Sequence, residues 1–170
     1  MSHEHGEDGG SSIPYATARG RDWPSVRQFN VFVENRVGNL LSVVRHFEST
    51  DIRIVSLMVV DSADCAIIRM VLSDPERALE IFHRARLPVT ESDLLVVQLP
   101  DGVRPLLDIC KALLGAEISI HYAYPLLIGP RGCAAVALHV EDHETAAATL
   151  SRMGFTLFTE NDLQTDEGLT

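Results

Sequence analysis

The segment from Asn35 to Leu40 combines an amide side chain, a glycine and the expected start of a helix. Amides in the first turn of a helix lack backbone acceptors and carry partial positive charge, so they can bind a carboxylate. Gly38 would let such a group approach closely, and the side-chain oxygen of Asn35 could accept from an ammonium group or cap the helix. Two interpretations stay open: a site for a small zwitterion, or residues that only shape the turn and its cap.

A second polar turn, from Asp101 to Arg104, precedes another helical pattern. Pro105 lacks an amide hydrogen, and Arg104 adds bulk and charge where the first turn has Gly38. Arg104 could bind a carboxylate through two hydrogen bonds, but the lost amide and glycine favour a structural role. We therefore expect one competent site per chain.

Two tyrosines stand two positions apart in the extended run HYAYP. Alternation along a strand places Tyr122 and Tyr124 on one face, with His121 and Ala123 on the other. The tyrosines could line a ligand crevice or a dimer surface, or they could form a half-buried face with satisfied hydroxyls. Met58 and Asp61 hold similar places earlier in the chain, although Asp61 could instead start a turn.

Sequence patterns of catalysis are lacking: there is no GxSxG, HExxH, P-loop or GxGxxG motif. The sequence therefore predicts a protein that is not an enzyme, with no catalytic residue, no cofactor and no metal site. Three cysteines, Cys65, Cys110 and Cys133, have no CxxC spacing and lie among apolar neighbours, which predicts buried free thiols.

Charge and hydrophobicity restrict the classes of partner that the sequence predicts. The 170 residues carry a formal net charge of -10, and the basic residues are scattered, which argues against nucleic acid. No apolar run approaches the roughly 20 residues that span a bilayer, and the N-terminus has no signal-type apolar region. We expect a cytoplasmic protein without membrane contact.

The apolar periodicity predicts alternating strands and helices. Strands are expected at 28–33, 52–60, 65–72 and near Val89, and helices at 39–49 and 75–85. The first helix should bury Leu40, Val44 and Phe47, or else Leu41 and Val44. The second should start at the cap Asp74, followed by Pro75, and bury Ala78, Leu79 and Phe82.

The same βαββαβ order then occurs again. An offset of 66 positions aligns Leu40 with Leu106 and Val31 with Val97, and an offset of 68 aligns Asp74 with Asp142. The fold class is therefore α+β: two ferredoxin-like units, each an antiparallel sheet with its helices on one face. The expected organisation is a disordered tail (1–26), a first domain (27–92), a second domain (93–163) and a C-terminal tail (164–170).

The turns ENRVGNL and LPDGVRPL, the strands DIRIVSLMV and EISIHYAYPL, and the helix starts SDPERA and EDHETA resemble tandem ACT domains. The resemblance covers about residues 27–163 and is strongest to small stand-alone bacterial proteins made of two ACT domains. At the first turn, Asn35, Gly38 and Leu40 match the family pattern, while Val37 replaces the common proline. ACT domains bind amino acids or similar small metabolites and regulate an attached or partner protein.

The expected function is thus an amino-acid-binding regulatory protein without a catalytic domain. The alternative is a ligand-free dimerisation or docking module that regulates a metabolic enzyme through protein contact. Exposed sheet edges and helix-free faces favour a homodimer. The expected ligand-binding residues are Asn35, Arg36, Val37, Gly38, Asn39, Leu40, Met58, Asp61, Asp101, Val103, Arg104, Tyr122 and Tyr124.

Overall fold

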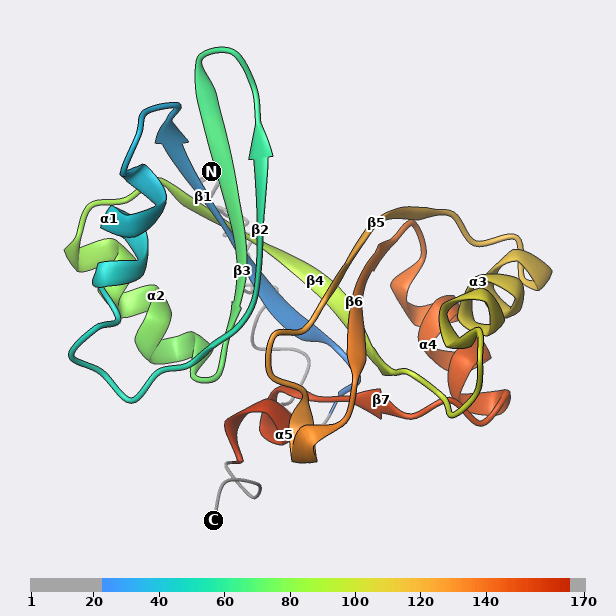
Figure 1. Ribbon diagram of the computed structural model, residues 1–170. Helices are drawn as coiled ribbons and strands as arrows, with labels where there is room; N and C mark the ends of the chain where they lie inside the picture. Colours follow the sequence, from blue (N-terminus) through green and yellow to red (C-terminus); the bar gives the residue numbers. More distant parts are fainter. Residues whose placement is uncertain (1–22, 166–170) are drawn as a thin grey trace, which may run out of the picture.

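Seven strands form one antiparallel sheet in the computed structural model, which describes residues 23–165 (Figure 1). The strand order is β2-β3-β1-β4-β6-β5, and β7 also pairs with β4. Helices pack on the sheet, so the predicted α+β class is confirmed. Most of the two predicted tails, 1–22 and 166–170, lies outside the described residues.

The first half of the chain follows the predicted order closely. Its elements are β1 (Val26–Glu34), α1 (Asn39–Arg45), β2 (Ile54–Asp61), β3 (Cys65–Leu72) and α2 (Pro75–Arg84). Helix α1 ends four residues earlier than expected, because bonds from Phe47 N to Val44 O and from Glu48 N to Arg45 O tighten the chain into turns.

The second half repeats this order. Its elements are β4 (Val89–Gln98), α3 (Pro105–Gly115), β5 (Ile120–Pro125), the 3₁₀ helix η2 (Pro130–Gly132), β6 (Ala135–Val140), α4 (His143–Arg152), β7 (Leu157–Phe158) and α5 (Glu160–Gln164). The two caps that the repeat aligns both form: Asp74 accepts from Arg77 N at 3.2 Å, and Asp142 accepts from Thr145 N at 3.0 Å.

Strand β4 belongs to both halves. Its segment Val89–Leu94 pairs with β1, and its segment Leu95–Gln98 pairs with β6, while Val96 and Val97 also pair with β7. The expected boundary between residues 92 and 93 lies inside this strand. The last strand of the first unit and the first strand of the second are therefore continuous, with no linker between them.

Each half has its own core between sheet and helices. In the first, Phe29, Met70 and Phe82 are fully buried, and the side chains of Val43 and Phe47 come from the α1 segment. The predicted buried face of α1 is wrong in part, since Leu40 and Leu41 are 41% and 54% exposed. The run NLLSVVRHF contains adjacent apolar residues at Leu40–Leu41 and at Val43–Val44, so its periodicity fits more than one buried face. Packing on the sheet buries Val43 and Phe47.

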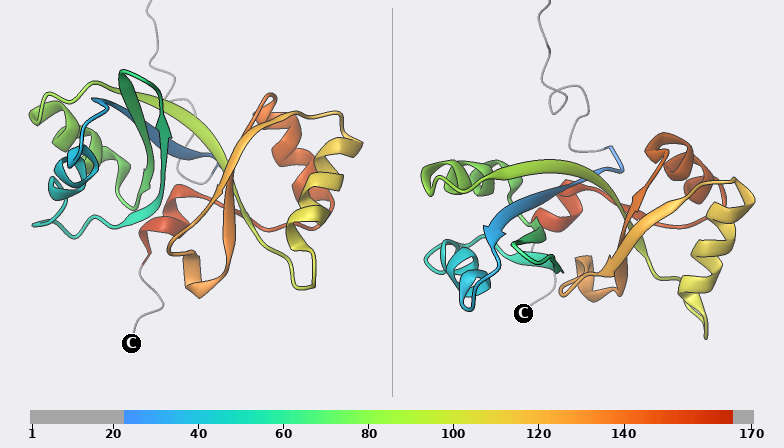
Figure 2. Two further views of the ribbon diagram at one scale, coloured as in Figure 1. Left: turned by 45° about the horizontal axis from the view of Figure 1, so that its top comes forward. Right: turned by 90° about the horizontal axis from the view of Figure 1, so that it is seen from above.

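A third core joins the helix-free faces of the two halves, and we call this interface the seam. Its buried residues are Val26, Val55, Val71, Leu94, Val96, Tyr124, Ala135, Ala137, Phe158 and Leu163. The sheet curls so that its two edge strands approach at one end: Leu127 N donates to Val55 O at 2.8 Å, just beyond β5 (Figure 2). Each half therefore covers part of the bare face of the other.

The cysteine prediction is wrong as to burial. All three are free thiols, but Cys65 is exposed, and Cys110 and Cys133 are half-buried. Cys65 lies at the exposed first position of β3, next to the hairpin turn.

Candidate functional site

The start of α1 is open to solvent. Gly38 is its N-cap residue, with φ of 90°, and no side chain caps the helix. A Cβ added to Gly38 would meet no atom within 4 Å, and the side chain of Val37 is fully exposed. The first-turn amides that the sequence singled out are thus accessible to a small molecule.

The side chain of Asn35 does not cap the helix but bonds to the β2–β3 hairpin. Its Nδ2 donates to Asp61 Oδ1 at 2.5 Å and to Ser62 O at 3.1 Å, so it ties the turn to the β2–β3 hairpin. Asn39 Nδ2 donates to Glu34 O. The structure therefore brings Asn35 and Asp61 together, 26 positions apart in sequence. No side chain caps α1, but its first amide, Asn39 N, donates to Arg36 O at 3.3 Å.

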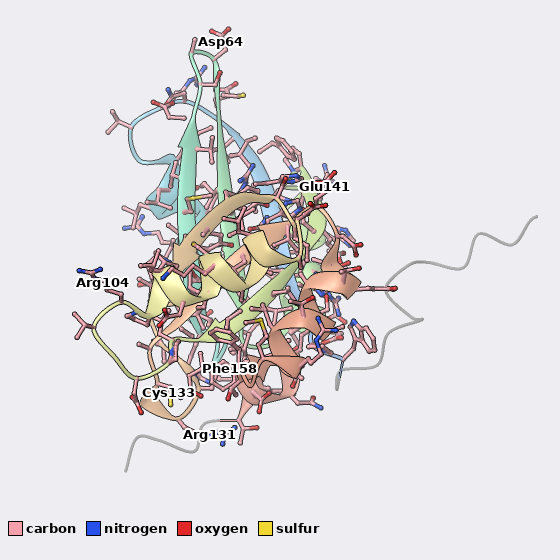
Figure 3. All side chains as sticks on the ribbon, turned by 90° about the vertical axis from the view of Figure 1, so that its right-hand side faces the viewer. Asp64, Arg104, Arg131, Cys133, Glu141 and Phe158 are labelled. Atoms are coloured by element: carbon pink, nitrogen blue, oxygen red, sulfur yellow. The ribbon has the colours of Figure 1, made fainter. Side chains whose placement is uncertain are left out.

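The second turn is also exposed, but it is built differently. Gly102 has φ of 139°, Val103 is 96% exposed, and Arg104 is the N-cap residue of α3 with no side-chain cap bond. Figure 3 shows Arg104 projecting outward at the start of α3, away from Asp64 at the tip of the β2–β3 hairpin. Helices α1 and α3 lie at opposite sides of the molecule (Figure 1), so one chain does not join the two turns in a single pocket.

The remaining expected residues, Met58, Tyr122 and Tyr124, gather at the seam. Tyr124 is buried, and its hydroxyl donates to Gln28 Oε1 at 2.6 Å. The hydroxyl of Tyr122 accepts from Gln28 Nε2 at 2.9 Å. Both hydroxyls are satisfied, and the expected set is split into three separate groups.

A polar network at the seam was missed by the sequence analysis. Gln28 is fully buried, and its Nε2 also donates to Asn30 Oδ1 at 2.7 Å. Asn30 Nδ2 in turn donates to Ser92 Oγ at 2.8 Å. Polar residues that alternate with Phe29 and Val31 are typical of a solvent-facing strand surface. Their burial follows from the second half, which covers this face.

Arg69 lies beside this network on β3. Its guanidinium carbon is 3.9 Å from the centroid of the Tyr122 ring, and its buried Nε has no hydrogen-bond partner. The Tyr122 ring stacks on His139, with centroids 4.7 Å apart and planes at 8°. His121 Nδ1 lies 3.2 Å from His139 Nδ1.

Burial and charge perturb two groups here. Burial, followed by the positive charges of His121, Arg69 and His143, lowers the pKa of His139 below its ordinary value, while Asp93 opposes the change. Burial likewise raises the pKa of Tyr124, so this phenol stays protonated at physiological pH. The seam is therefore a partly desolvated region in which the cationic Arg69 lies against the Tyr122 ring.

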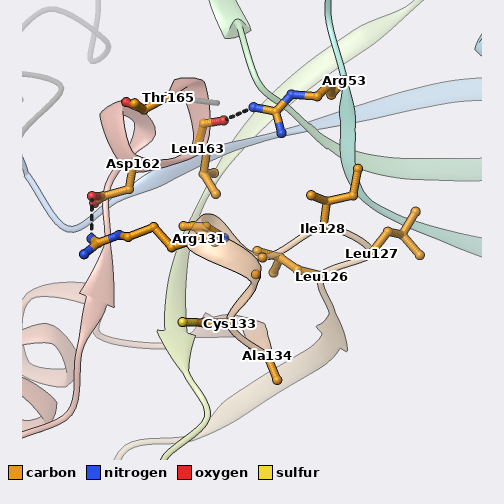
Figure 4. A pocket seen from close by; sticks show the side chains of 13 residues that line it. Arg53, Leu126, Leu127, Ile128, Arg131, Cys133, Ala134, Asp162, Leu163 and Thr165 are labelled. Atoms are coloured by element: carbon orange, nitrogen blue, oxygen red, sulfur yellow. Dashed lines mark hydrogen bonds and ion pairs between the residues drawn. The ribbon is translucent and has the colours of Figure 1, made fainter. Parts of the chain in front are cut away.

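Two cavities lie elsewhere. One, of about 460 Å³, is lined by the β5–β6 connection, α5 and Arg53 and is open to solvent on one side (Figure 4). Its arginines are engaged: Arg53 Nη2 donates to Leu163 O at 3.0 Å, and Arg131 lies 3.5 Å from Asp162. The other, of about 490 Å³, lies beside α1 between Leu41, Phe47 and Ile52. Neither cavity contains a residue of the expected ligand-binding set.

Two ferredoxin-like units in tandem, each with an exposed turn before its first helix, define the class of ACT domain pairs. The family model described as "ACT domain pair" matches residues 24–165, and the chain belongs to this family. An ACT domain pair is a regulatory module. No curated protein matches the chain.

Solved structures support the fold. The chain is similar to protein BT0572 from Bacteroides thetaiotaomicron, with a TM-score of 0.74 and 22% identity over 82% of this chain and 96% of that one. It is also similar to the regulatory subunit of aspartate kinase from Thermus thermophilus, with a TM-score of 0.51 and 11% identity over 75% and 91% of the two chains. Within residues 23–165, none of the helices is long and apolar enough to cross a membrane.

Proposed function

We propose that the protein is a cytoplasmic regulatory protein that binds a free amino acid, or a similar small metabolite, reversibly and without catalysis. The observation that carries this proposal is the uncapped, solvent-open start of α1 at Gly38 in a member of the ACT domain pair family. The ligand carboxylate would accept from the first-turn amides that follow Asn39, whose own N–H donates to Arg36 O, and the neighbouring pair Asn35 and Asp61 would hold its ammonium group.

This site is open on its outer side, and walls from a second copy would complete it. Small-molecule sites are usually concave and form preferentially between domains. The turn at Gly38 and the hairpin residue Asp61 lie at the surface, so a homodimer could place another copy against them. The identity of the side chain that fits would then depend on both copies.

Regulation requires that occupancy changes a surface which another protein reads. A ligand shifts such an equilibrium only by its differential affinity for the two arrangements. One structural relative is described as the regulatory subunit of aspartate kinase in its ligand-free form, which supports a metabolic enzyme as the kind of partner.

The test is a thermal-shift screen of the twenty amino acids. A ligand present at 100 times its dissociation constant should stabilise the fold by about 2.7 kcal/mol, which corresponds to roughly 5–10 °C for a domain of this size. In the Gly38→Val variant, the added side chain blocks approach to the amides, and the shift should disappear.

The matched control is Gly102→Val. Gly102 also has a positive φ, and a Cβ there also meets no atom within 4 Å, so the two substitutions should strain the backbone comparably. Gly102→Val should keep the ligand-induced shift. If both variants lose it equally, the helix start of the first half is not the site.

An alternative function is a ligand-free dimerisation or docking module. The exposed apolar side chains Leu40 and Leu41 on α1, and Leu106 and Leu107 on α3, favour protein contact. If no amino acid stabilises the wild-type protein, this alternative replaces the amino-acid-binding proposal.

A further inference from the structure

The half-buried side chain of Arg69 contains a buried donor that has no partner in the described part of the chain. Among residues 23–165, Arg69 forms no ion pair with a carboxylate, and its Nε is the one buried side-chain nitrogen or oxygen without a hydrogen-bond partner. A buried donor to which no acceptor is offered destabilises a fold by about 1–3 kcal/mol, and more when it is charged. Such a group is therefore well placed to receive an anion.

The neighbouring polar groups leave Arg69 with no acceptor of its own. Gln28 uses its amide on Asn30, Tyr122 and Tyr124, and Asn30 uses its amide on the side chain of Ser92. These bonds satisfy the network internally. The donor that stays without an acceptor at the seam is thus the Nε of Arg69, a cationic side chain.

Aromatic rings determine the position of the Arg69 guanidinium. The Tyr122 ring supports the guanidinium at 3.9 Å and stacks on His139. His139 and His121 approach each other through their Nδ1 atoms, and no group of three metal-binding side chains exists among the described residues. Asp93 is the nearby carboxylate that acts electrostatically on His139, and Ser25 Oγ donates to it at 3.0 Å.

The two halves differ at this face in a way that simple packing does not require. The repeat aligns Gln28 with Leu94, Asn30 with Val96, and Arg69 with Ala137. In the second half these positions are apolar and form part of the buried seam. The first half thus places polar side chains in the seam where the second half has apolar ones.

We propose that Arg69 anchors a second ligand site, in the seam between the two halves, that takes the carboxylate of a small organic acid. A guanidinium binds a planar carboxylate through two parallel hydrogen bonds, and Tyr122 would form the apolar wall beside it. His139 lies on the same aromatic stack and adds a donor when protonated. This site is separate from the helix start at Gly38 and does not depend on the proposed function.

The test uses the full chain, with acetate as the probe and sodium chloride at equal ionic strength as the reference. Ring resonances of Tyr122 and His139, assigned by Tyr122→Phe and His139→Phe, should shift saturably with acetate. In Arg69→Gln the apparent affinity should fall at least tenfold. Arg77→Gln, at an exposed arginine of α2, should leave it unchanged.

Sodium phosphate is the second arm of the experiment. Equal or tighter saturation by phosphate would overturn the carboxylate assignment, and shifts that stay linear with acetate would overturn the site. Backbone spectra show whether Arg69→Gln is folded, and Arg69→Lys, which keeps the charge but loses the paired donors, should also weaken acetate binding. Saturation by acetate that survives in Gly38→Val would separate this site from the helix start, whereas its loss there would refute their independence.

Discussion

At the residue scale, Arg27 holds distant parts of the chain together. It lies on β1, and its guanidinium approaches Glu76 of α2 at 3.1 Å, Glu91 of β4 at 3.6 Å and Glu160 of α5 at 3.4 Å. Glu160 also accepts from Arg27 N at 3.0 Å. Burial raises the pKa of Glu160, and the charge and hydrogen bonds of Arg27 counteract that effect. Arg27 therefore offsets part of the cost of burying this carboxylate.

Replacing Arg27 by glutamine should destabilise the protein by about 2–4 kcal/mol, because Glu160 would stay partly buried without its cation. The matched control is Arg36→Gln, which removes an arginine whose pair with Glu34 is exposed on both sides; it should change stability by less than about 1 kcal/mol. Urea unfolding at pH 7 measures both. Equal losses of unfolding free energy in the two variants would show that the ion pairs of Arg27 stabilise the fold no more than an exposed pair does.

Sequence predicts residue roles where the partners are close along the chain. The cap Asp74 with Pro75 was predictable, because cap and amide are three positions apart. The bond from Asn35 to Asp61 was not, since it depends on how the hairpin folds back on the turn. The same holds for Arg69 and Tyr122, which come from different halves.

At the element scale, β4 determines how the halves are joined. Leu94 and Val96 point into the seam, whereas Leu95 and Val97 point into the core of the second half. The continuous apolar run LLVV is typical of a strand covered on both faces, and it was the available signal for this arrangement. The repeat predicted the order of elements correctly, but a shared strand looks the same in sequence as two strands at a boundary.

Because β4 contributes hydrogen bonds to both halves, we expect them to unfold in one transition. Calorimetry should give equal calorimetric and van't Hoff enthalpies, and amides of β4 should exchange only by global unfolding. Leu95→Ala, at a fully buried position in the second half, should lower stability by about 2–4 kcal/mol and shift probes in both halves together. Two separate transitions would contradict this expectation.

At the scale of the whole molecule, the unit of function is expected to be a pair of chains. The seam covers the helix-free faces within one chain, so the cover that the sequence analysis sought from a second copy is partly supplied internally. What stays exposed is apolar surface on the helices, notably Leu41 of α1 and Leu114 of α3. Sequence could not predict this division, because it depends on how the two halves of the curled sheet face each other.

The proposed homodimer should have twice the 18.7 kDa mass of one chain in light scattering after size-exclusion chromatography. Leu41→Glu places a charge on the exposed face of α1 and should shift the mass toward that of the monomer. Met153→Glu, at a 57% exposed position after α4, serves as the control and should leave the mass unchanged. A wild-type protein that is monomeric at micromolar concentration would contradict the dimer.

The shared strand also restricts how this chain can change in length. Tandem domains usually tolerate insertions and deletions between them, because a flexible tether absorbs the extra residues. Here a single residue inserted after Leu94 would exchange the two faces of every later position in β4. Val96 would then turn toward the helices, and Leu95 and Val97 toward the seam. Insertions and deletions among natural versions of this protein should therefore occur in the hairpins and helix connections, and not within β4.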